Sequence, residues 1–573
     1  MPYRHPSKLK VVKENSITTA QTLSERFIGW SNAACSAEAL APKQHALAAL
    51  AALPAFEPVA SIDYHSQGRL LVLAADARVT DFAKNLPASL SLSVLWQGSN
   101  PAPVLANADV VTGKLSSLSG YLGKFDLVFA SIDGARELHQ ASFDLVLDLN
   151  VSPHFQMASP PQGFLHAPDA ATLEVALAEL PDMVGEFDKP KFFAYKESLC
   201  AHSRSKITGC HKCIEICSTQ AISSDGDKVK VDPHLCMGCG ACSTVCPSGA
   251  MAYQYPRASD RGAQLRALIG GFGRAAPTIM FHNGVDGAAH LTAKVEAGRG
   301  VPADVLPIET WHVAAIGLDV LLGSIAYGAA HVAVLAAGSE TPAYAAAVKK
   351  EMVVAEQILA ALGYSGKHFS WVDSADALWD LPTGSTVNTR ATFHLSNDKR
   401  GTLEMVIGHL VKEGKTKPAE IALPAGSMYG RINVDKQKCT MCLACAGACP
   451  ESALMDGGEV PLLKFLERNC VQCGLCEKTC PEKAITLTPR LLLTEDRKRE
   501  VVLNESEPFG CISCGKSLGT KVMIENMLGK LVGHSMFAGE GKLNRLKMCA
   551  DCRVVDMMSN KNEMSILTGK NLE

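Results

Sequence analysis

Residues 439–450 read Cys-Thr-Met-Cys-Leu-Ala-Cys-Ala-Gly-Ala-Cys-Pro, and this stretch decides what kind of fold surrounds it. Three cysteines follow one another with two residues between them, and a fourth comes three residues later with a proline behind it. Three thiolates at this spacing let one tight loop wrap three corners of a cubane iron–sulfur cluster, with backbone N–H groups directed at the sulfurs. The fourth cysteine is expected to begin a short helix that turns its thiolate toward a neighbouring cluster. The same spacing recurs at 236–247 and 470–481.

A fourth group of cysteines departs from this spacing. It reads Cys200-x9-Cys210-x2-Cys213-x3-Cys217, and Ser218 stands where the other groups have proline. The insert between the first two cysteines can be a longer loop that closes on the same cluster, with Cys200 as a ligand. Alternatively, Cys200 does not ligate, which leaves a three-iron cluster or a substitution by His202 or His211. We favour Cys200 as the ligand.

The four groups form an internal repeat, arranged as two pairs. After its last cysteine, each group continues in a related way: Cys-Ser-Thr-Gln-Ala-Ile at 217–222, Cys-Pro-Ser-Gly-Ala-Met at 246–251, Cys-Pro-Glu-Ser-Ala-Leu at 449–454 and Cys-Pro-Glu-Lys-Ala-Ile at 480–485. Four copies of one unit indicate two related modules, each with two metal-binding groups.

The two modules resemble the bacterial ferredoxins that carry two [4Fe-4S] clusters. This resemblance implies α+β modules, four [4Fe-4S] clusters in all, and a fourth cysteine in each run that binds the other cluster of its pair. It implies four ligand sets: Cys200, Cys210 and Cys213 with Cys246; Cys236, Cys239 and Cys242 with Cys217; Cys439, Cys442 and Cys445 with Cys480; and Cys470, Cys473 and Cys476 with Cys449. Tetrahedral zinc is the alternative, but zinc uses cysteine pairs and gives triplets followed by Cys-Pro no role.

Four further cysteines near the C-terminus form two CxxC knuckles, Cys511-x2-Cys514 and Cys549-x2-Cys552. Two separated pairs suit one tetrahedral ion, so zinc is favoured here, and a further iron–sulfur cluster stays open. Residues 510–517 also satisfy the phosphate-binding pattern G-x-x-x-x-G-K-[ST]. Such a loop follows directly from a buried strand, whereas the polar residues 504–508 precede this one. We therefore interpret the string as a metal knuckle.

Long stretches without clustered cysteines separate these modules. The chain has 573 residues and 21 cysteines, of which Cys35 alone lies outside the groups and is expected to be a small core residue. A helical stretch at 37–53 precedes short apolar strands, which predicts an α/β parallel-sheet layer. The predicted strands of this layer are residues 70–73, 93–95, 127–130 and 145–147.

A second α/β layer is predicted between the two modules. Its strand candidates are residues 278–281, 305–308 and 331–336, with a buried helix at 313–327. The expected domains are therefore an α/β domain at 1–190, a ferredoxin module at 191–257, an α/β domain at 258–428, a second ferredoxin module at 429–492 and a metal-knuckle domain at 493–573.

Charge and hydropathy exclude several classes of protein. The formal net charge of −3 lacks the excess of positive charge that is typical of nucleic-acid-binding proteins. The longest apolar stretch, 313–338, contains Asp319, His331 and several glycines, so we interpret it as a buried helix and strand. Residues 1–23 are polar and lack the apolar core of a secretory signal. A soluble, cytoplasmic protein is expected, and in that reducing compartment cysteines bind metals more often than they form disulfides.

A wider resemblance suggests a partner. Four stretches make the chain similar to large proteobacterial 4Fe-4S binding proteins, whose genes commonly accompany those of formate dehydrogenase and its maturation factors: residues 200–213, 306–312, 469–474 and 548–557. The middle α/β domain is weakly similar to the small electron-transfer subunit associated with heterodisulfide reductases, although it lacks that subunit's clustered cysteines.

These observations predict an electron-transfer protein that relays single electrons through four [4Fe-4S] clusters. The resemblance implies a redox protein partner, such as formate dehydrogenase or its maturation factors. Two alternatives stay open. One is a flavin- or nicotinamide-dependent oxidoreductase subunit of the heterodisulfide-reductase type, in which an α/β domain binds the substrate. The other is a formate dehydrogenase maturation factor.

Overall fold

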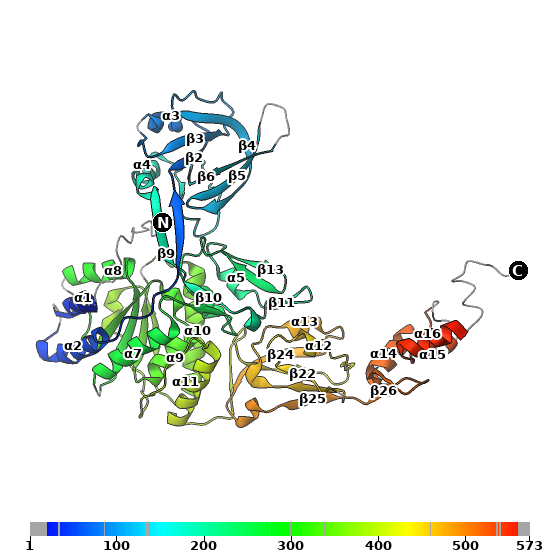
Figure 1. Ribbon diagram of the computed structural model, residues 1–573. Helices are drawn as coiled ribbons and strands as arrows, with labels where there is room; N and C mark the ends of the chain where they lie inside the picture. Colours follow the sequence, from blue (N-terminus) through cyan, green and yellow to red (C-terminus); the bar gives the residue numbers. More distant parts are fainter. Residues whose placement is uncertain are drawn as a thin grey trace. The chain divides into compact units, whose positions relative to one another are not determined.

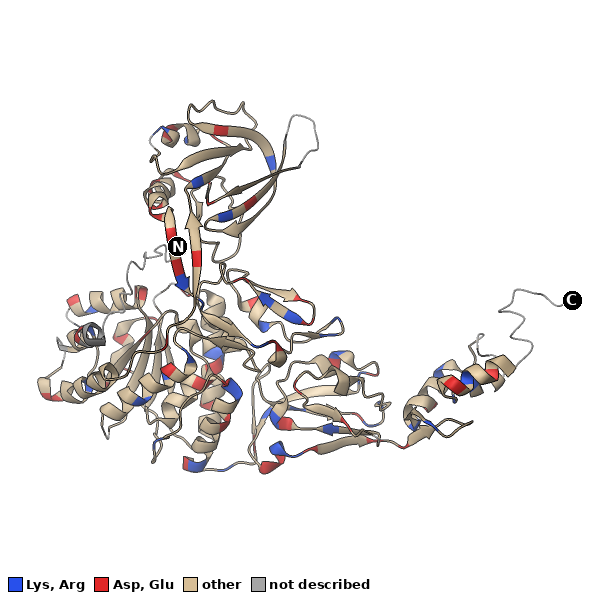
Figure 2. Ribbon diagram, viewed as in Figure 1, with Lys and Arg blue, Asp and Glu red and all other residues tan. Residues whose placement is uncertain are grey.

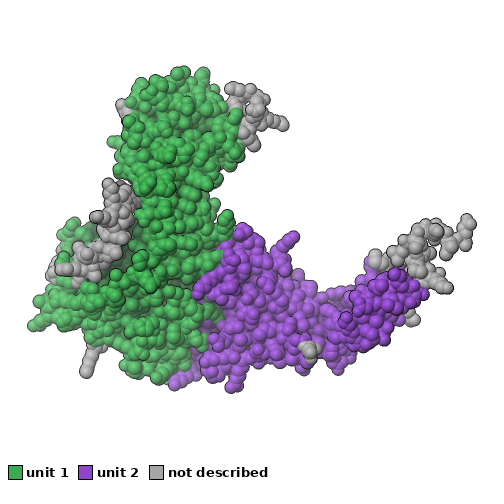
Figure 3. Space-filling view, viewed as in Figure 1, with its two compact units in different colours: residues 1–195, 212–223, 230–416 green, residues 196–211, 224–229, 417–573 purple. Residues whose placement is uncertain are grey.

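The chain separates into two units, coloured green and purple in Figure 3. Unit 1 comprises residues 1–195, 212–223 and 230–416, and unit 2 comprises residues 196–211, 224–229 and 417–573. The first cysteine-rich module therefore contributes residues to both units. The computed structural model describes residues 20–559 except 33–34, 85, 132–137, 274, 298, 337, 339, 459, 535–536 and 538–539. Most of the polar N-terminal segment weighed for a signal thus lies outside the described residues.

A seven-stranded sheet in unit 1 forms the N-terminal layer (Figure 1). Its order is β6-β5-β4-β3-β2-β7-β8, and the strands are β2 Arg69–Ala74, β3 Ser91–Trp96, β4 Ala108–Tyr121, β5 Lys124–Ser131, β6 Leu138–Phe143, β7 Leu145–Asp148 and β8 Phe164–His166. The strands from β4 to β8 by way of β3, β2 and β7 are parallel, as predicted. The long β4 instead turns back into antiparallel β5 and β6, so the sheet is mixed.

Both faces of this sheet are covered because successive side chains of a strand point to opposite sides. Leu70 and Val72 of β2 pack into one core, together with helices α3 (Arg78–Ala83) and α4 (Ala170–Glu179). Leu71 and Leu73 pack into a second core, which the antiparallel strands β4 and β5 cover. Two further strands, β1 (Ser61–Ser66) and β9 (Gly185–Pro190), form a separate antiparallel ribbon.

Asp144, between β6 and β7, fixes the start of β2. Its carboxylate accepts hydrogen bonds from the backbone N–H groups of Gln67 (2.9 Å) and Arg69 (3.0 Å), and from Nη2 of Arg69 (2.6 Å). Desolvation raises the pKa of Asp144, but these hydrogen bonds outweigh it and hold the pKa below its usual range. The lowered pKa means that ionised Asp144 stabilises the folded sheet. This contribution is fully present above the unfolded pKa of about 3.9 and is lost as pH falls through the lower folded pKa.

Replacing Asp144 with asparagine is expected to destabilise the N-terminal sheet by about 2–4 kcal/mol near neutral pH, because the buried side chain loses the charge that accepts these hydrogen bonds. Hydrogen exchange of β2 and β7 measures the change. The difference from the unmodified chain should shrink once the pH falls below about 4. Asp76→Asn is the control, because Asp76 pairs with Arg78 at the surface. Equal exchange in the two variants would contradict the role given to Asp144.

The middle layer of unit 1 is a four-stranded parallel sheet in the order β17-β16-β18-β19. The strands are β16 Thr278–Asn283, β17 Val305–Thr310, β18 His331–Leu335 and β19 Phe369–Val372, and the helices around them are α7 Ala258–Gly271, α8 Asp286–Glu296, α9 Leu318–Ala326, α10 Pro342–Ala361 and α11 Lys399–Glu413. Every residue of β16 and β18 is buried, as expected for strands covered on both faces. The predicted strands 278–281 and 305–308 lie within β16 and β17, and the predicted strand 331–336 matches β18 except for its last residue.

The buried helix predicted at 313–327 is interrupted. A 3₁₀ turn covers Val313–Ala315, and α9 begins only at Leu318. Nδ1 of His312 accepts the backbone N–H of Ala314 (3.0 Å), which fixes the turn, and Gly317 is extended before α9 starts. The hydropathy pattern shows the burial of this segment but not the break.

Helices α1 (Ala20–Asn32) and α2 (Ala37–Ala51) belong to the middle layer, although the expected boundary at 190 grouped them with the N-terminal sheet. Nε1 of Trp30 donates to Oγ1 of Thr292 in α8 (3.2 Å), and the carbonyl of Trp30 accepts the N–H of Val301 (2.7 Å). Sequence order gave no sign of these contacts across about 260 residues. Cys35 lies between α1 and α2 in the sequence. We expected it in the core, but it is only partly buried.

The two cysteine-rich modules have short helices and short antiparallel strands. In unit 1 the elements are α5 Lys212–Ile216, α6 Ala241–Val245 and the paired strands β10 Phe193–Tyr195 and β15 Met251–Tyr253. The other strands near the first module are β11 Ser203–Arg204, β12 Ile207–Thr208, β13 Ile222–Asp225 and β14 Lys228–Val231.

The second module lies wholly in unit 2. Its helices are α12 Ala444–Ala448 and α13 Leu475–Thr479, and its strands are β20 Glu420–Ala422, β21 Gly430–Val434, β22 Leu454–Asp456, β23 Leu462–Phe465, β24 Ile485–Leu492 and β25 Val501–Glu505. In both modules each short helix ends just before the fourth cysteine of a group, so this cysteine follows the helix and does not begin it, contrary to expectation.

The C-terminal part of unit 2 consists of the hairpin strands β26 (Pro508–Gly510) and β27 (Ser517–Thr520) and the helices α14 Lys521–Leu531, α15 Glu540–Arg545 and α16 Ala550–Ser559. Among the described residues, no helix combines the length and apolar character needed to cross a bilayer. Lys and Arg are interspersed with Asp and Glu along the elements of each unit (Figure 2).

Candidate metal centres

The backbone of the cysteine loops shows how they suit an anionic group. In each of the three regular groups, the residues just before and just after the second cysteine are left-handed: Gly238 (φ 79°) and Gly240 (74°), Met441 (55°) and Leu443 (60°), and Gln472 (53°) and Gly474 (81°). When left-handed residues alternate with residues of ordinary backbone conformation, successive N–H groups point to the same side of the chain and form an anion-binding nest. The irregular first group has no left-handed residue at the corresponding positions, Gly209 and His211, beside its second cysteine, Cys210.

The segment after the fourth cysteine repeats as well. Its third residue is left-handed in all four groups: Gln220, Gly249, Ser452 and Lys483. This turn brings backbone N–H groups onto the sulfur of the fourth cysteine. Ala453 donates to Cys449 (3.3 Å) and Ala484 to Cys480 (3.3 Å). The repeat read from the sequence is therefore also a repeat of backbone conformation.

In the second module, the fourth cysteine of one group lies with the first three of the other. One cavity is lined by Cys439, Cys442, Cys445 and Cys480. Burial raises the pKa of Cys445 to about 12, and the thiols of those three neighbours add to the shift. Burial also raises the pKa of Cys473 to about 12, with contributions from the thiols of Cys449 and Cys470.

The same exchange of cysteines occurs in unit 1. A cavity there is lined by Cys217, Cys236, Cys239 and Cys242. Burial raises the pKa of Cys239 to about 12, and Cys236 and Cys217 contribute to the shift. Buried thiols with raised pKa values hold their protons unless a cation replaces them, so these cavities suit iron bound through thiolates and release protons on binding. The donor sets thus fit [4Fe-4S] clusters.

The irregular first group is divided between the units. Cys200 and Cys210 lie in unit 2, and Cys213 and Cys246 lie in unit 1. Both ring nitrogens of His202 have partners: Nδ1 is 2.9 Å from the carbonyl of Cys210, and Nε2 is 2.8 Å from Oγ of Ser224. A switch of His202 to a metal ligand would break one of these bonds, which weighs against that alternative.

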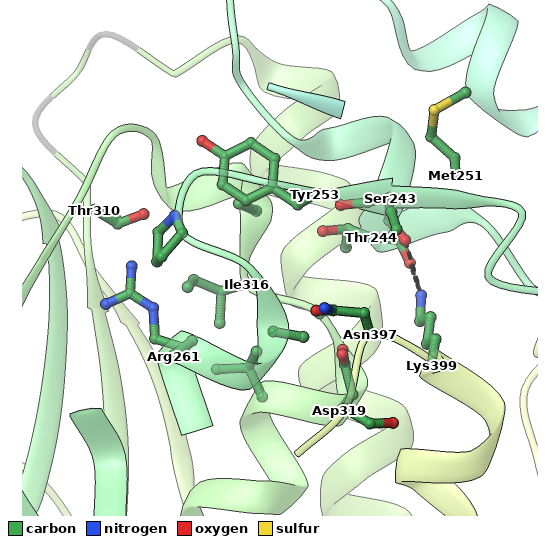
Figure 4. Close-up of a pocket in the computed structure, with 17 residues that line it drawn as sticks. Ser243, Thr244, Met251, Tyr253, Arg261, Thr310, Ile316, Asp319, Asn397 and Lys399 are labelled. Carbon is green, nitrogen blue, oxygen red and sulfur yellow. Dashed lines mark hydrogen bonds between the residues drawn. The ribbon is translucent and has the colours of Figure 1, made fainter. Parts of the chain in front are cut away.

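Two lysines that the sequence did not single out hold the ends of the regular group in unit 1. Nζ of Lys189 donates to the carbonyls of His234 (2.7 Å) and Cys236 (2.8 Å), and burial lowers the pKa of Lys189 to about 8. Nζ of Lys399 donates to the carbonyls of Ser243, Thr244 and Cys246 at the end of α6. Figure 4 shows Lys399 reaching toward this segment.

A small cavity lies beside the same helix. Arg261, Asp319, Asn397 and Lys399 line it together with Tyr253 (Figure 4). Its volume is about 60 Å³, whereas sites for small-molecule ligands measure roughly 300–1,000 Å³. This cavity is too small for a flavin or a nicotinamide.

The four C-terminal cysteines lie together. The sulfur atoms of Cys511, Cys514, Cys549 and Cys552 are all within 4.8 Å of one another, and those of Cys514 and Cys549 are 3.7 Å apart. A tetrahedral ion with bonds of about 2.3 Å to sulfur places its ligands roughly 3.8 Å apart. In a cubane each thiolate binds a different iron, which requires a wider spacing. The group can therefore hold a metal ion, and its spacing suits a single one.

One thiol of this group, that of Cys511, loses its proton more easily than an ordinary cysteine does. Desolvation raises the pKa of Cys511, but backbone N–H groups of Cys549, Cys514 and Ser513 outweigh it and bring the pKa to about 6.

Residues 510–517, which match the phosphate-binding string, join the antiparallel strands β26 and β27. A phosphate-binding loop joins a strand to a helix, so the structure agrees with a metal knuckle.

Comparisons with known proteins agree on the two modules. Residues 208–250 match the 4Fe-4S dicluster domain, and residues 432–455 and 464–486 match the 4Fe-4S binding domain. The first match begins after Cys200, so a ligand role for Cys200 stays a prediction. Both modules are 4Fe-4S-binding domains of ferredoxin type, and the formate dehydrogenase link stays outside these findings.

Several relatives are similar over one such segment. The chain is 48% identical over 50 residues to the indolepyruvate oxidoreductase subunit IorA of Pyrococcus horikoshii, and 36% identical over 52 residues to hydrogenase-4 component A of Escherichia coli. These segments are 8% and 9% of this chain and cover 8% and 25% of those proteins. An uncharacterized ferredoxin of Methanocaldococcus jannaschii is 39% identical over 51 residues, which are 9% of this chain and 82% of that protein.

Proposed function

Through its two cysteine-rich modules this chain belongs to the ferredoxin family of iron–sulfur electron-transfer proteins, and we propose that it relays single electrons through four [4Fe-4S] clusters. The observation that carries this proposal is the exchange of the fourth cysteine between paired groups, beside loops whose N–H groups form anion-binding nests. A [4Fe-4S] cluster accepts and releases one electron at a time and needs no proton from the protein.

The proposed ligands are the four sets that the ferredoxin resemblance implies. The short loops and the helices α5, α6, α12 and α13 position these cysteines. For the irregular set we propose Cys200 as the fourth ligand, and the engagement of both ring nitrogens of His202 supports it over that histidine. Backbone N–H groups on the sulfurs stabilise the added negative charge of a reduced centre.

Contacts within unit 2 support a route between the modules. Nζ of Lys478 in α13 donates to the carbonyl of Thr208 (2.7 Å), and Gly209 packs against Leu475 so closely that a Cβ atom there would lie 2.5 Å from that side chain. The thiol of Cys210 lies near enough to Cys473 to add to the raised pKa of Cys473. The insert in the first group thus places one of its cysteines beside the second module, and we propose that electrons pass between the modules here.

The proposed partner is a redox protein, because the relatives are named as a subunit of an oxidoreductase and a component of a hydrogenase. The sequence resemblance favours a formate dehydrogenase system as that partner. For the C-terminal group we propose one zinc ion, because its sulfur spacing suits a single tetrahedral ion.

Anaerobic purification followed by elemental analysis tests the relay. We expect about sixteen iron atoms and as many sulfides per chain, four of each for every cluster. The clusters should be reduced by formate only when formate dehydrogenase is present, and NAD(P)H alone should leave them oxidised. Iron far below that number would contradict the four-cluster proposal. Bound flavin, or direct reduction by NAD(P)H, would favour an oxidoreductase subunit instead.

A further inference from the structure

Ser218, the residue that replaces proline in the first group, is the start of a hydrogen-bonded chain that ends on a cysteine sulfur. Its backbone N–H donates to Oη of Tyr344 (3.4 Å), a bond that proline could not make. The hydroxyl groups of Ser218 and Tyr344 are also hydrogen-bonded, and Oγ of Ser218 lies 3.0 Å from Oγ of Ser159. The hydroxyl of Tyr344 in turn hydrogen-bonds to the sulfur of Cys239, and Cys239 packs against the buried cluster that contains Tyr344.

The direction of this chain follows from what each group can donate. A thiolate sulfur bound to a cluster only accepts hydrogen bonds. The single proton of the Tyr344 hydroxyl therefore points at Cys239, and Oη accepts the backbone N–H of Ser218. All of these residues lie in unit 1. They come from three separate parts of it, since Ser159 follows β7, Ser218 follows α5, and Tyr344 lies in the first turn of α10.

The ring of Tyr344 is fixed in place. Tyr344 is 2% exposed, and the ring of His312 packs edge-on against it with 5.3 Å between the ring centres. Oγ1 of Thr341 caps α10 by accepting the N–H of Tyr344 (3.3 Å). His312 also caps the 3₁₀ turn before α9, so a second element besides α10 holds the tyrosine in place.

We propose that Tyr344 is a positioning residue that sets the reduction potential of the cluster held by Cys217, Cys236, Cys239 and Cys242, and that Ser218 orients its hydroxyl. A hydrogen bond to a ligand sulfur stabilises the reduced, more negative cluster and so raises its potential. The middle α/β domain then contributes to the electron relay, because one of its helices makes this cluster easier to reduce. The inference rests on the proposed four-cluster function.

Replacing Tyr344 with phenylalanine removes one hydroxyl and keeps the ring. In redox titrations followed by EPR, we expect one of the four potentials to shift to a more negative value and three to stay unchanged. Resonance Raman spectra should show a changed Fe–S(Cys) stretching band, which a purely structural role would not produce. Ser218→Pro should shift the same potential in the same direction by a smaller amount.

Tyr327→Phe is the matched control. Tyr327 is also 2% exposed and lies in the same domain, but its hydroxyl bonds to the carbonyl of Phe393 (3.1 Å) and not to a sulfur. This variant should keep all four potentials. Unchanged potentials and spectra in a Tyr344→Phe chain with full iron would overturn the inference, as would an equal shift in Tyr327→Phe. If Tyr344→Phe loses this cluster, Ser218→Pro decides: a negative shift supports the inference and an unchanged potential overturns it.

The iron and sulfide content of the unmodified chain keeps the two proposals apart. A chain that binds far fewer than four clusters fails the proposed function, whatever the variants show. A chain with four clusters and no shift in either variant fails only the inference about Tyr344 and Ser218.

Discussion

Removal of iron is expected to unfold the second module and to leave the N-terminal sheet folded. Cys445, Cys470 and Cys476 are themselves buried members of the core of this module, beside Leu463 and Phe465. Without clusters, cysteine thiols and a cavity take the place of bound iron in that core, so the free energy of metal binding is largely the free energy of folding.

Hydrogen exchange before and after chelation measures this effect. Protection of β21 and β24 should fall by roughly a hundredfold or more, about 3 kcal/mol of local stability. Strands β2 and β7 serve as the internal control, because they contain no cysteine and pack into cores of their own. Protection of β21 that survives complete loss of iron would contradict the role given to the clusters.

The second large effect is expected at the C-terminal cysteine group. Between residues 508 and 559, the buried residues among those described are only Cys511, Thr520, Ile524 and Cys549. A region with so small an apolar core needs another source of stability, and structural zinc supplies about 10–16 kcal/mol of binding free energy in peptides of this kind.

Cys549→Ser should therefore lower the zinc content from one ion per chain to about a tenth of that or less, and residues 508–559 should become sensitive to proteolysis. Elemental analysis and limited proteolysis measure the two changes. Cys35→Ser is the matched control, since Cys35 belongs to no cysteine group, and it should keep both zinc and iron. Zinc that persists in the Cys549→Ser chain, or iron in place of zinc in the unmodified chain, would refute the single-zinc proposal.

Local patterns predicted much of the fold. The strands at 278–281, 305–308 and 331–336 were visible because a strand covered on both faces is a continuous apolar run. The cysteine spacing predicted 4Fe-4S-binding domains because the geometry of the cluster dictates that spacing, and the family comparisons confirmed this part. The individual ligand sets stay predictions.

Features that depend on contacts between distant residues could not be predicted. The packing of α1 on the middle layer depends on Trp30 meeting Thr292, and neither residue carries a local signal for it. Tyr344 was also missed, because a tyrosine in the first turn of a helix is ordinary until Cys239 is found beside it. The serine at 218 was the available sign, since a departure from a repeated proline frees an N–H group for a partner.

The left-handed residues of the nests imply that two of these loops differ in how readily they form. Gly238 and Gly240 adopt that conformation without steric cost, so their loop can take its shape in the newly made chain. Met441 and Leu443 adopt it at a cost of about 1–2 kcal/mol each, which the empty loop has little to offset. The loop around Cys239 can thus form without a bound group, whereas the loop around Cys442 needs bonds to its ligand to offset that cost.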